Sequence, residues 1–161
     1  MKNLTSHSPR IFKRYGKILT MLVGGFLTAF SPVSQATLGG DINSILDDQT
    51  TFNATLQTTK IGAYTEYVLT LPDGGIVYET IGDSGLVFQV RWKGKGHRPN
   101  MEQLLGTFAD RYSNQSKKSK PQERRFSKTE GDLVVQSSVR NRHFKGRAYI
   151  PSLVPTGFSI N

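Results

Sequence analysis

The sequence predicts an α+β domain, an antiparallel meander sheet of about five or six strands with two helices packed on it. Two segments carry apolar residues at helical spacing, most of the remaining order alternates with period two, and Gly/Asp-rich turns separate the alternating segments. The chain has 161 residues, 36% of them hydrophobic, and no cysteine. One domain with an apolar core fits these values, and a disulfide framework or a thiolate metal site is excluded.

The first 36 residues have the composition of a signal peptide, which leaves residues 37–161 as the single mature domain. Residues 1–17 hold five basic residues and no acid, and residues 18–30 form an apolar run. This run is shorter than the roughly 20 residues that a membrane helix needs. Ser34-Gln35-Ala36 places small residues where a signal peptidase reads, so we expect cleavage between Ala36 and Thr37. An uncleaved N-terminal anchor is the alternative.

Removal of the leader changes the charge balance. The whole chain has 21 basic and 12 acidic residues, and the leader takes five of the basic ones, which leaves a net charge of +4. Residues 37–112 have six basic and nine acidic residues, whereas residues 113–161 have ten and three. An anion-binding surface is therefore expected in the C-terminal part.

The first helix is expected from Ile42 to Phe52, with Asp41 as its N-cap. Asp47 and Asp48 are adjacent and point in different directions, so we expect two solvated acids rather than a shared site. The apolar stripe of this helix is expected to be Ile42, Ile45, Leu46 and Phe52.

Strands are expected from Thr55 through Ile61 and on to Leu71, then over Ile76 to Ile81 and Leu86 to Lys93. Pro72-Asp73-Gly74-Gly75 and Gly82-Asp83-Ser84-Gly85 supply turns between them. In the last of these strands, alternation directs Leu86, Phe88, Val90 and Trp92 to the core and Val87, Gln89, Arg91 and Lys93 to water.

The second helix is expected to begin after Asn100, which forms an N-cap pair with Gln103. Residues 113–128 are rich in Lys, Arg and Ser and are expected to be a mobile basic linker. Further strands are expected around residues 133–137 and 144–150, with a turn at Arg140-Asn141-Arg142. The helix should pack on the sheet through Met101, Leu104, Leu105, Phe108, Ala109 and Tyr112.

No catalytic or metal site follows from residue spacing. His97 and His143, the two histidines of the mature chain, lack the spacing of a metal motif. No serine lies in a G-x-S-x-G elbow, and Gly94-Lys95-Gly96 lacks the rest of a phosphate loop. We expect no cofactor and no bound metal, and the residues favour a protein that is not an enzyme.

The candidate binding residues are the basic side chains of the C-terminal hairpin. Alternation places Lys145 and Arg147 on the face opposite Phe144 and Ala148. We expect an anionic partner, such as lipid headgroups, lipopolysaccharide or an acidic glycan, or else a protein partner. The alternative is a solvated face that only keeps the protein soluble. The residues concerned are Arg140, Arg142, His143, Lys145 and Arg147.

Several short sequence segments follow one another along the chain in a characteristic order. The first is Leu38-Gly39-Gly40. A later one is Val87-Phe88-Gln89-Val90-Arg91-Trp92, and the last is Phe144-Lys145-Gly146-Arg147-Ala148-Tyr149-Ile150-Pro151. Together the segments resemble a family of exported bacterial proteins catalogued only as a domain of unknown function. The resemblance covers nearly all of residues 38–155. It implies export and a Gram-negative bacterial setting, and it supplies no activity and no site residue.

These observations favour a periplasmic or secreted, non-enzymatic binding or interaction module of the cell envelope. Two alternatives stay open: a small exported hydrolase whose pocket gathers residues distant in sequence, and an assembly or structural factor of the envelope. The leader argues against a nucleic-acid partner, and no stable membrane span is expected after cleavage.

Overall fold

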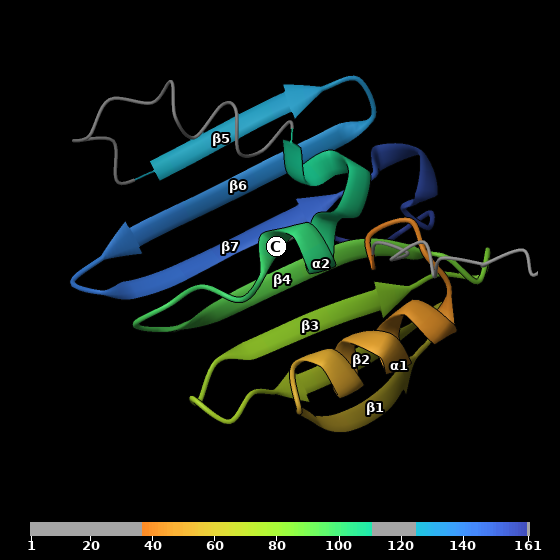
Figure 1. The fold of residues 1–161 in the computed structure, drawn as a ribbon. Helices are drawn as coiled ribbons and strands as arrows, with labels where there is room; N and C mark the ends of the chain where they lie inside the picture. Colours follow the sequence, from red (N-terminus) through yellow and green to blue (C-terminus); the bar gives the residue numbers. More distant parts are fainter. Residues whose placement is uncertain (1–36, 111–124, 161) are drawn as a thin grey trace, which may run out of the picture. The chain divides into compact units, whose positions relative to one another are not determined.

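The computed structural model describes residues 37–110 and 125–160, and their strands form one seven-stranded antiparallel sheet (Figure 1). The strand order is β1-β2-β3-β4-β7-β6-β5. The predicted leader, Tyr112 and residues 113–124 of the predicted linker lie outside the described residues. The strands are β1 Thr55–Ile61, β2 Tyr64–Thr70, β3 Ile76–Ile81, β4 Val87–Lys95, β5 Arg125–Glu130, β6 Leu133–Arg140 and β7 His143–Tyr149.

The predicted α+β class and antiparallel meander are confirmed, but the sheet has seven strands rather than five or six. The additional strand is β5, whose first four residues fall in the predicted linker. It pairs with β6 at the edge of the sheet. Because an edge strand is held largely by backbone hydrogen bonds, it needs no apolar alternation, and its polar composition hid it.

Two helices cover one face of this sheet (Figure 1). Helix α1 spans Ile42–Thr51, and its N-cap Asp41 accepts a hydrogen bond from the backbone N–H of Asn43 at 2.9 Å, as predicted. Helix α2 spans Met101–Leu105 and is capped by Asn100. A 3₁₀ turn, Gly106–Phe108, follows, and the next two residues, Ala109 and Asp110, are again α-helical. Gly106 has a φ of 48°, outside the right-handed helical region, so α2 ends earlier than its apolar pattern predicts.

The predicted apolar stripe of α1 is partly wrong. Ile42 and Leu46 are 37% and 44% exposed, whereas Ile45 is fully buried. Ser44 and Asp48 share the buried face with Ile45. The prediction that Asp48 is solvated is therefore also wrong, and Asp47 alone is exposed. Polar partners from other segments hold Asp48 inside, as described below.

A β-bulge changes the expected facing of β4. The register between β3 and β4 shifts at Thr80/Ile81, so that Ile81 pairs with Val87. Val87 consequently joins the core under the helices. Phe88 turns to the other side, where its ring meets the Phe158 ring at a centroid distance of 4.8 Å. The predictions that Phe88 faces the same side as Val90 and Trp92, and that Val87 faces water, are wrong for this reason.

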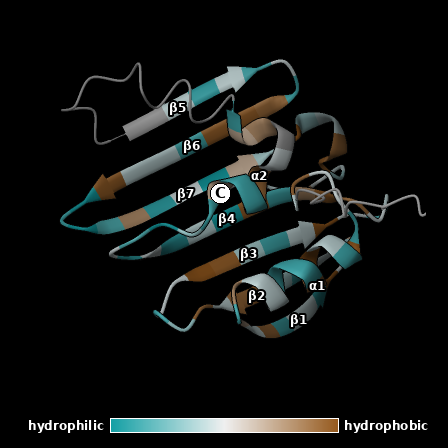
Figure 2. Ribbon diagram, in the orientation of Figure 1, coloured by the Kyte–Doolittle hydropathy of each residue, from teal (hydrophilic) through white to brown (hydrophobic). Residues whose placement is uncertain are grey.

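The core lies between the helices and the covered face of the sheet. Hydrophobic residues alternate with hydrophilic ones along the strands, as a sheet with one buried and one solvated face requires (Figure 2). Trp92, 1% exposed, lies against Gly146 of the neighbouring strand, where an added Cβ would be 2.4 Å from the indole. The buried cluster includes Leu38, Ile45, Leu69, Val77, Val90, Leu104, Leu105, Val135 and Ala148.

Candidate functional site

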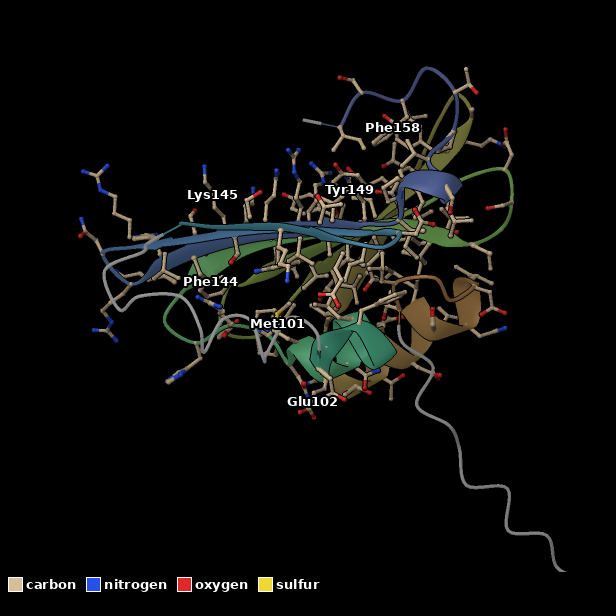
Figure 3. All side chains as sticks on the ribbon, turned by 90° about the horizontal axis from the view of Figure 1, so that it is seen from above. Met101, Glu102, Phe144, Lys145, Tyr149 and Phe158 are labelled. Atoms are coloured by element: carbon tan, nitrogen blue, oxygen red, sulfur yellow. The ribbon has the colours of Figure 1, made fainter. Side chains whose placement is uncertain are left out.

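The face of the sheet opposite the helices, here called the open face, carries the predicted basic residues. Figure 3 shows Met101 and Phe144 on the helix side and Lys145, Tyr149 and Phe158 on the other. The ring of Phe158, from the C-terminal segment, packs edge-on against Tyr64 and Phe88 at 4.9 and 4.8 Å. The C-terminal segment thus covers one end of the open face.

Cross-strand register gathers basic residues into three adjacent rows on the open face. Lys95, His143 and Arg140 form one row across β4, β7 and β6. Lys93 lies opposite Lys145 in the next row, and Arg91 lies opposite Arg147 in the third. We call this set the basic ladder: Arg91, Lys93, Lys95, Arg140, His143, Lys145 and Arg147.

Like charges that face each other across strands destabilise a sheet. Arg91 is compensated, because it forms an ion pair with Glu66 and lies over the Tyr78 ring at 4.6 Å. Arg147 donates a hydrogen bond from Nε to Gln136 Oε1 at 2.7 Å. Among the described residues, no carboxylate pairs with Lys93, Lys95 or Lys145. Lys93 Nζ lies 5.2 Å from the centroid of the Tyr78 ring, so a cation–π contact offsets part of its charge, but no acid neutralises this part of the ladder.

The end of the ladder that has no paired acid borders a cavity of about 470 Å³. Its charged lining is wholly basic, because Lys93, Lys95, Arg140, His143 and Lys145 contribute and no acid does. Gly74, Ile76, Gly94, Ser138 and Phe144 complete it. A concave, positively charged surface of this kind attracts and holds anions.

The structure brings most of the predicted binding residues together. Arg140, His143 and Lys145 line the cavity, and Arg147 lies in the row behind it. Arg142 is exposed in the two-residue turn that joins β6 to β7, with a φ of 64°. Its neighbour Asn141 has a φ of 51°. A two-residue turn with positive φ at both residues strongly prefers Gly as its second residue, which here is Arg142. A basic residue occupies this position in spite of the backbone cost.

The sequence prediction missed the contribution of β4. Alternation had placed Arg91 and Lys93 on the water-facing side, which is correct, but it did not connect them with the C-terminal hairpin. The pairing of β4 with β7 joins segments about fifty residues apart, and no local pattern indicates it.

A second polar cluster lies in the core. Asp48 of α1 and Glu79 of β3 are both 0% exposed. Asp48 accepts hydrogen bonds from the Thr37 hydroxyl and, at 2.6 Å, from Gln103 Nε2. No donor among the described residues reaches either carboxylate oxygen of Glu79.

Burial dominates the protonation of this pair. It raises the pKa of Asp48, although hydrogen bonds from Glu79, Thr37 and Gln103 oppose the rise. Burial, followed by the nearby Asp48 charge, raises the pKa of Glu79 to about 10. Glu79 therefore keeps its proton at neutral pH, next to the ionisable carboxyl of Asp48. Neither carboxyl lines the cavity on the open face.

Neither His97 nor His143 forms an ion pair with a carboxylate in the described ranges. His97 is exposed in the loop before α2, and His143 begins β7. Within residues 37–110 and 125–160, no group of three or more His, Asp or Glu side chains is placed to hold a metal ion. No helix in the same ranges is long and apolar enough to cross a membrane.

Comparison with known protein families shows the family to which the chain belongs. A family model described as "Protein of unknown function (DUF2844)" matches residues 34–161, which include the whole of the predicted mature chain, residues 37–161. The resemblance inferred from the ordered sequence segments is thereby confirmed. No curated protein and no solved structure matches.

Proposed function

We propose that this chain, which belongs to the DUF2844 family of proteins of unknown function, is an exported, non-enzymatic binding module that holds an acidic glycan of the cell envelope on its open face. The observation that supports this function is the basic ladder. Lys93 and Lys145 face each other without a paired carboxylate, an arrangement that is unfavourable for stability alone. An anionic ligand between them would remove the repulsion.

The dimensions of the ladder favour a linear ligand with several charges. Arg91, Lys93 and Lys95 alternate along β4, so their Cα atoms span about 13 Å at ~3.3 Å per residue. His143, Lys145 and Arg147 run beside them on β7. A single phosphate or carboxylate is much shorter than this array, whereas an oligosaccharide with repeated acidic groups contacts all three rows.

Uncharged hydrogen-bonding groups beside the ladder favour a glycan over a polymer of charge alone. Ser138 continues the Lys93–Lys145 row, and Gln136 and Ser127 continue the Arg91–Arg147 row. Gln136 donates to Ser127 Oγ at 3.4 Å and accepts from Arg147. Hydroxyl and amide groups next to cations suit a ligand that alternates hydroxyl and acidic groups.

Export is part of the proposal. The basic start, the apolar run of residues 18–30 and Ser34-Gln35-Ala36 support removal of the leader and function in the periplasm or outside the cell. The absence of cysteine fits a domain that depends on its apolar core in an oxidising compartment. The hydrolase alternative gains no support from the Asp48–Glu79 pair, because both carboxyls are fully buried.

The experiment compares two triple variants with equal net charge. One carries Lys93→Gln, Lys95→Gln and Lys145→Gln in the ladder. The control carries Lys117→Gln, Lys118→Gln and Lys120→Gln, which removes the same charge elsewhere in the sequence. Calorimetry measures binding of a heparin-derived octasaccharide and of an alginate octasaccharide at low and moderate salt.

We expect the ladder variant to bind roughly tenfold or more weakly, the control to bind within about twofold of the parent, and added salt to weaken the parent. Equal loss in both variants would show attraction by net charge alone and would contradict the site. Binding to phosphatidylglycerol vesicles with none to either oligosaccharide would replace the glycan with a lipid surface. Association with outer-membrane material that salt does not release would instead support an assembly or structural factor.

A further inference from the structure

Thr37, the residue that follows the expected cleavage site, is buried at the junction of α1, α2 and β4. It is 0% exposed, and its hydroxyl donates to Asp48. The backbone that follows is held by hydrogen bonds from Leu38 N to Leu104 O at 3.1 Å and from Gly39 N to Val87 O at 2.8 Å. The position of Thr37 in the core is therefore fixed by its own hydroxyl and by the backbone that follows it.

The carboxyl pair beside Thr37 lacks a cation. Asp48 and Glu79 are fully buried, the neighbouring charged residue on α1 is another acid, Asp47, and no described Lys, Arg or His pairs with them. Both oxygens of Glu79 are buried without a donor. A buried carboxylate without a positive partner is costly, and a buried polar group without a hydrogen-bond partner requires an explanation, such as a partner that these residues do not supply.

Leader removal supplies a cation at this place. Hydrolysis of the Ala36–Thr37 peptide bond transfers the hydroxyl of water to the Ala36 carbonyl carbon and a proton to the Thr37 nitrogen. The new α-amine takes up a second proton from solvent at neutral pH. Its nitrogen is bonded to the Cα that carries the Thr37 side chain, whose hydroxyl already contacts Asp48. We propose that the Asp48–Glu79 pair is the binding site for the α-ammonium group of processed Thr37.

The composition of the site matches an ammonium group. Three N–H donors replace the single amide donor of the unprocessed chain, which reaches Gln103 O at 3.5 Å. We expect the Glu79 oxygens, which no described donor reaches, and the Asp48 carboxylate to accept the two additional donors. With one ammonium, one carboxylate and one protonated carboxyl, the buried cluster is neutral overall. Before cleavage it has an unbalanced negative charge, so processing stabilises the folded domain.

This inference rests on the export part of the proposed function and is independent of the basic ladder. The test uses the full chain, expressed for export and purified from the envelope fraction. Intact-mass analysis locates the N-terminus, and amine acylation followed by mass spectrometry measures the labelling rate of the Thr37 amine in the native protein and in urea. The matched variants are Asp48→Asn and Asp47→Asn, one in the site and one on the exposed face of α1.

We expect a mass that begins at Thr37 and an amine that is acylated roughly tenfold or more slowly in the native state than in urea. Asp48→Asn should remove most of this protection, and Asp47→Asn should preserve it. If Asp48→Asn does not fold, a Gly inserted between Ala36 and Thr37 decides the matter. It moves the ammonium one residue away from the site and should restore fast labelling and lower the urea midpoint.

The two ways of failing are distinguishable. A chain that retains Met1, or one that begins at another residue, overturns both the cleavage and the ammonium site, and leaves the glycan-binding experiment unaffected. A chain that begins at Thr37 but is acylated as fast in the native state as in urea supports export and overturns the ammonium site alone.

Discussion

Lys93 of β4 and Lys145 of β7 lie directly opposite each other on the open face of the sheet. Both are exposed, and no carboxylate in the described ranges pairs with either. Like charges in this position oppose folding, whereas a bound anion turns the same positions into a favourable site. The pair therefore links a cost in stability to a gain in ligand binding.

Lys145→Gln should stabilise the free protein and weaken anion binding. Removing one charge of the facing pair should raise the free energy of unfolding by about 0.2–1 kcal/mol. Urea unfolding without ligand and octasaccharide calorimetry measure the two effects. The control is Lys60→Gln, because Lys60 is an exposed lysine of β1 that lies opposite Thr65. It should change neither the free energy of unfolding nor the affinity for the octasaccharide appreciably. A lower unfolding free energy for Lys145→Gln would contradict the repulsion.

Arg142→Gly should stabilise the β6–β7 hairpin. Arg142 has a φ of 64°, and releasing a non-glycine residue from the left-handed region should contribute about 1 kcal/mol. Arg140→Gly, which removes the same charge from the end of β6, should instead lower stability, because glycine weakens a strand. Urea midpoints compare the two. Equal shifts in the same direction would show that charge, rather than backbone conformation, controls this turn.

Glu79→Gln should remove a pH dependence of stability. The folded-state pKa of Glu79 is about 10, against an ordinary value of 4.5, so the folded state binds the extra proton between these limits. The stability contribution of this proton is fully present below about pH 4.5 and is lost as the pH rises towards 10.

The free energy of unfolding should therefore fall with rising pH in the parent, by at most about 1.4 kcal/mol per pH unit from this group. In Glu79→Gln the fall should be smaller. Urea unfolding of both proteins between pH 5 and 9 measures the difference, and parallel curves would mean that Glu79 is ionised in the folded protein.

Gly146→Ala should destabilise the sheet through Trp92. The added Cβ would lie 2.4 Å from the indole, so the ring or the strand must shift, at a cost of about 1–3 kcal/mol. Trp92→Leu alone removes the obstructing ring. In the double variant the cost of Gly146→Ala should therefore be smaller, a coupling that a double-mutant cycle measures. If the stability effects of Gly146→Ala and Trp92→Leu are additive, the strain does not come from the indole. It comes instead from the Gln136 carbonyl, which would lie 2.8 Å from the added Cβ.

Local patterns predicted what depends on local geometry. Alternation placed Arg91 and Lys93 correctly on the open face, and the caps at Asp41 and Asn100 marked the true helix starts. Val87 and Phe88 were misplaced because a bulge shifts the alternation of β4 without a signal in composition.

The rest depended on contacts between distant segments. Asp48 reads as a solvated acid because its partners Thr37, Gln103 and Glu79 come from other segments of the chain. The basic ladder likewise needs the β4–β7 pairing, which brings Lys93 and Lys95 beside the hairpin residues that the sequence did single out.

The most direct test of the open-face site is amide chemical-shift mapping of the processed protein during titration with the heparin-derived octasaccharide. The account predicts that saturable shifts concentrate in β4, β6 and β7, around Lys93, Arg140 and Lys145. Shifts confined to residues 113–124, or spread over α1 and β1 while β4 and β7 stay unchanged, would contradict it.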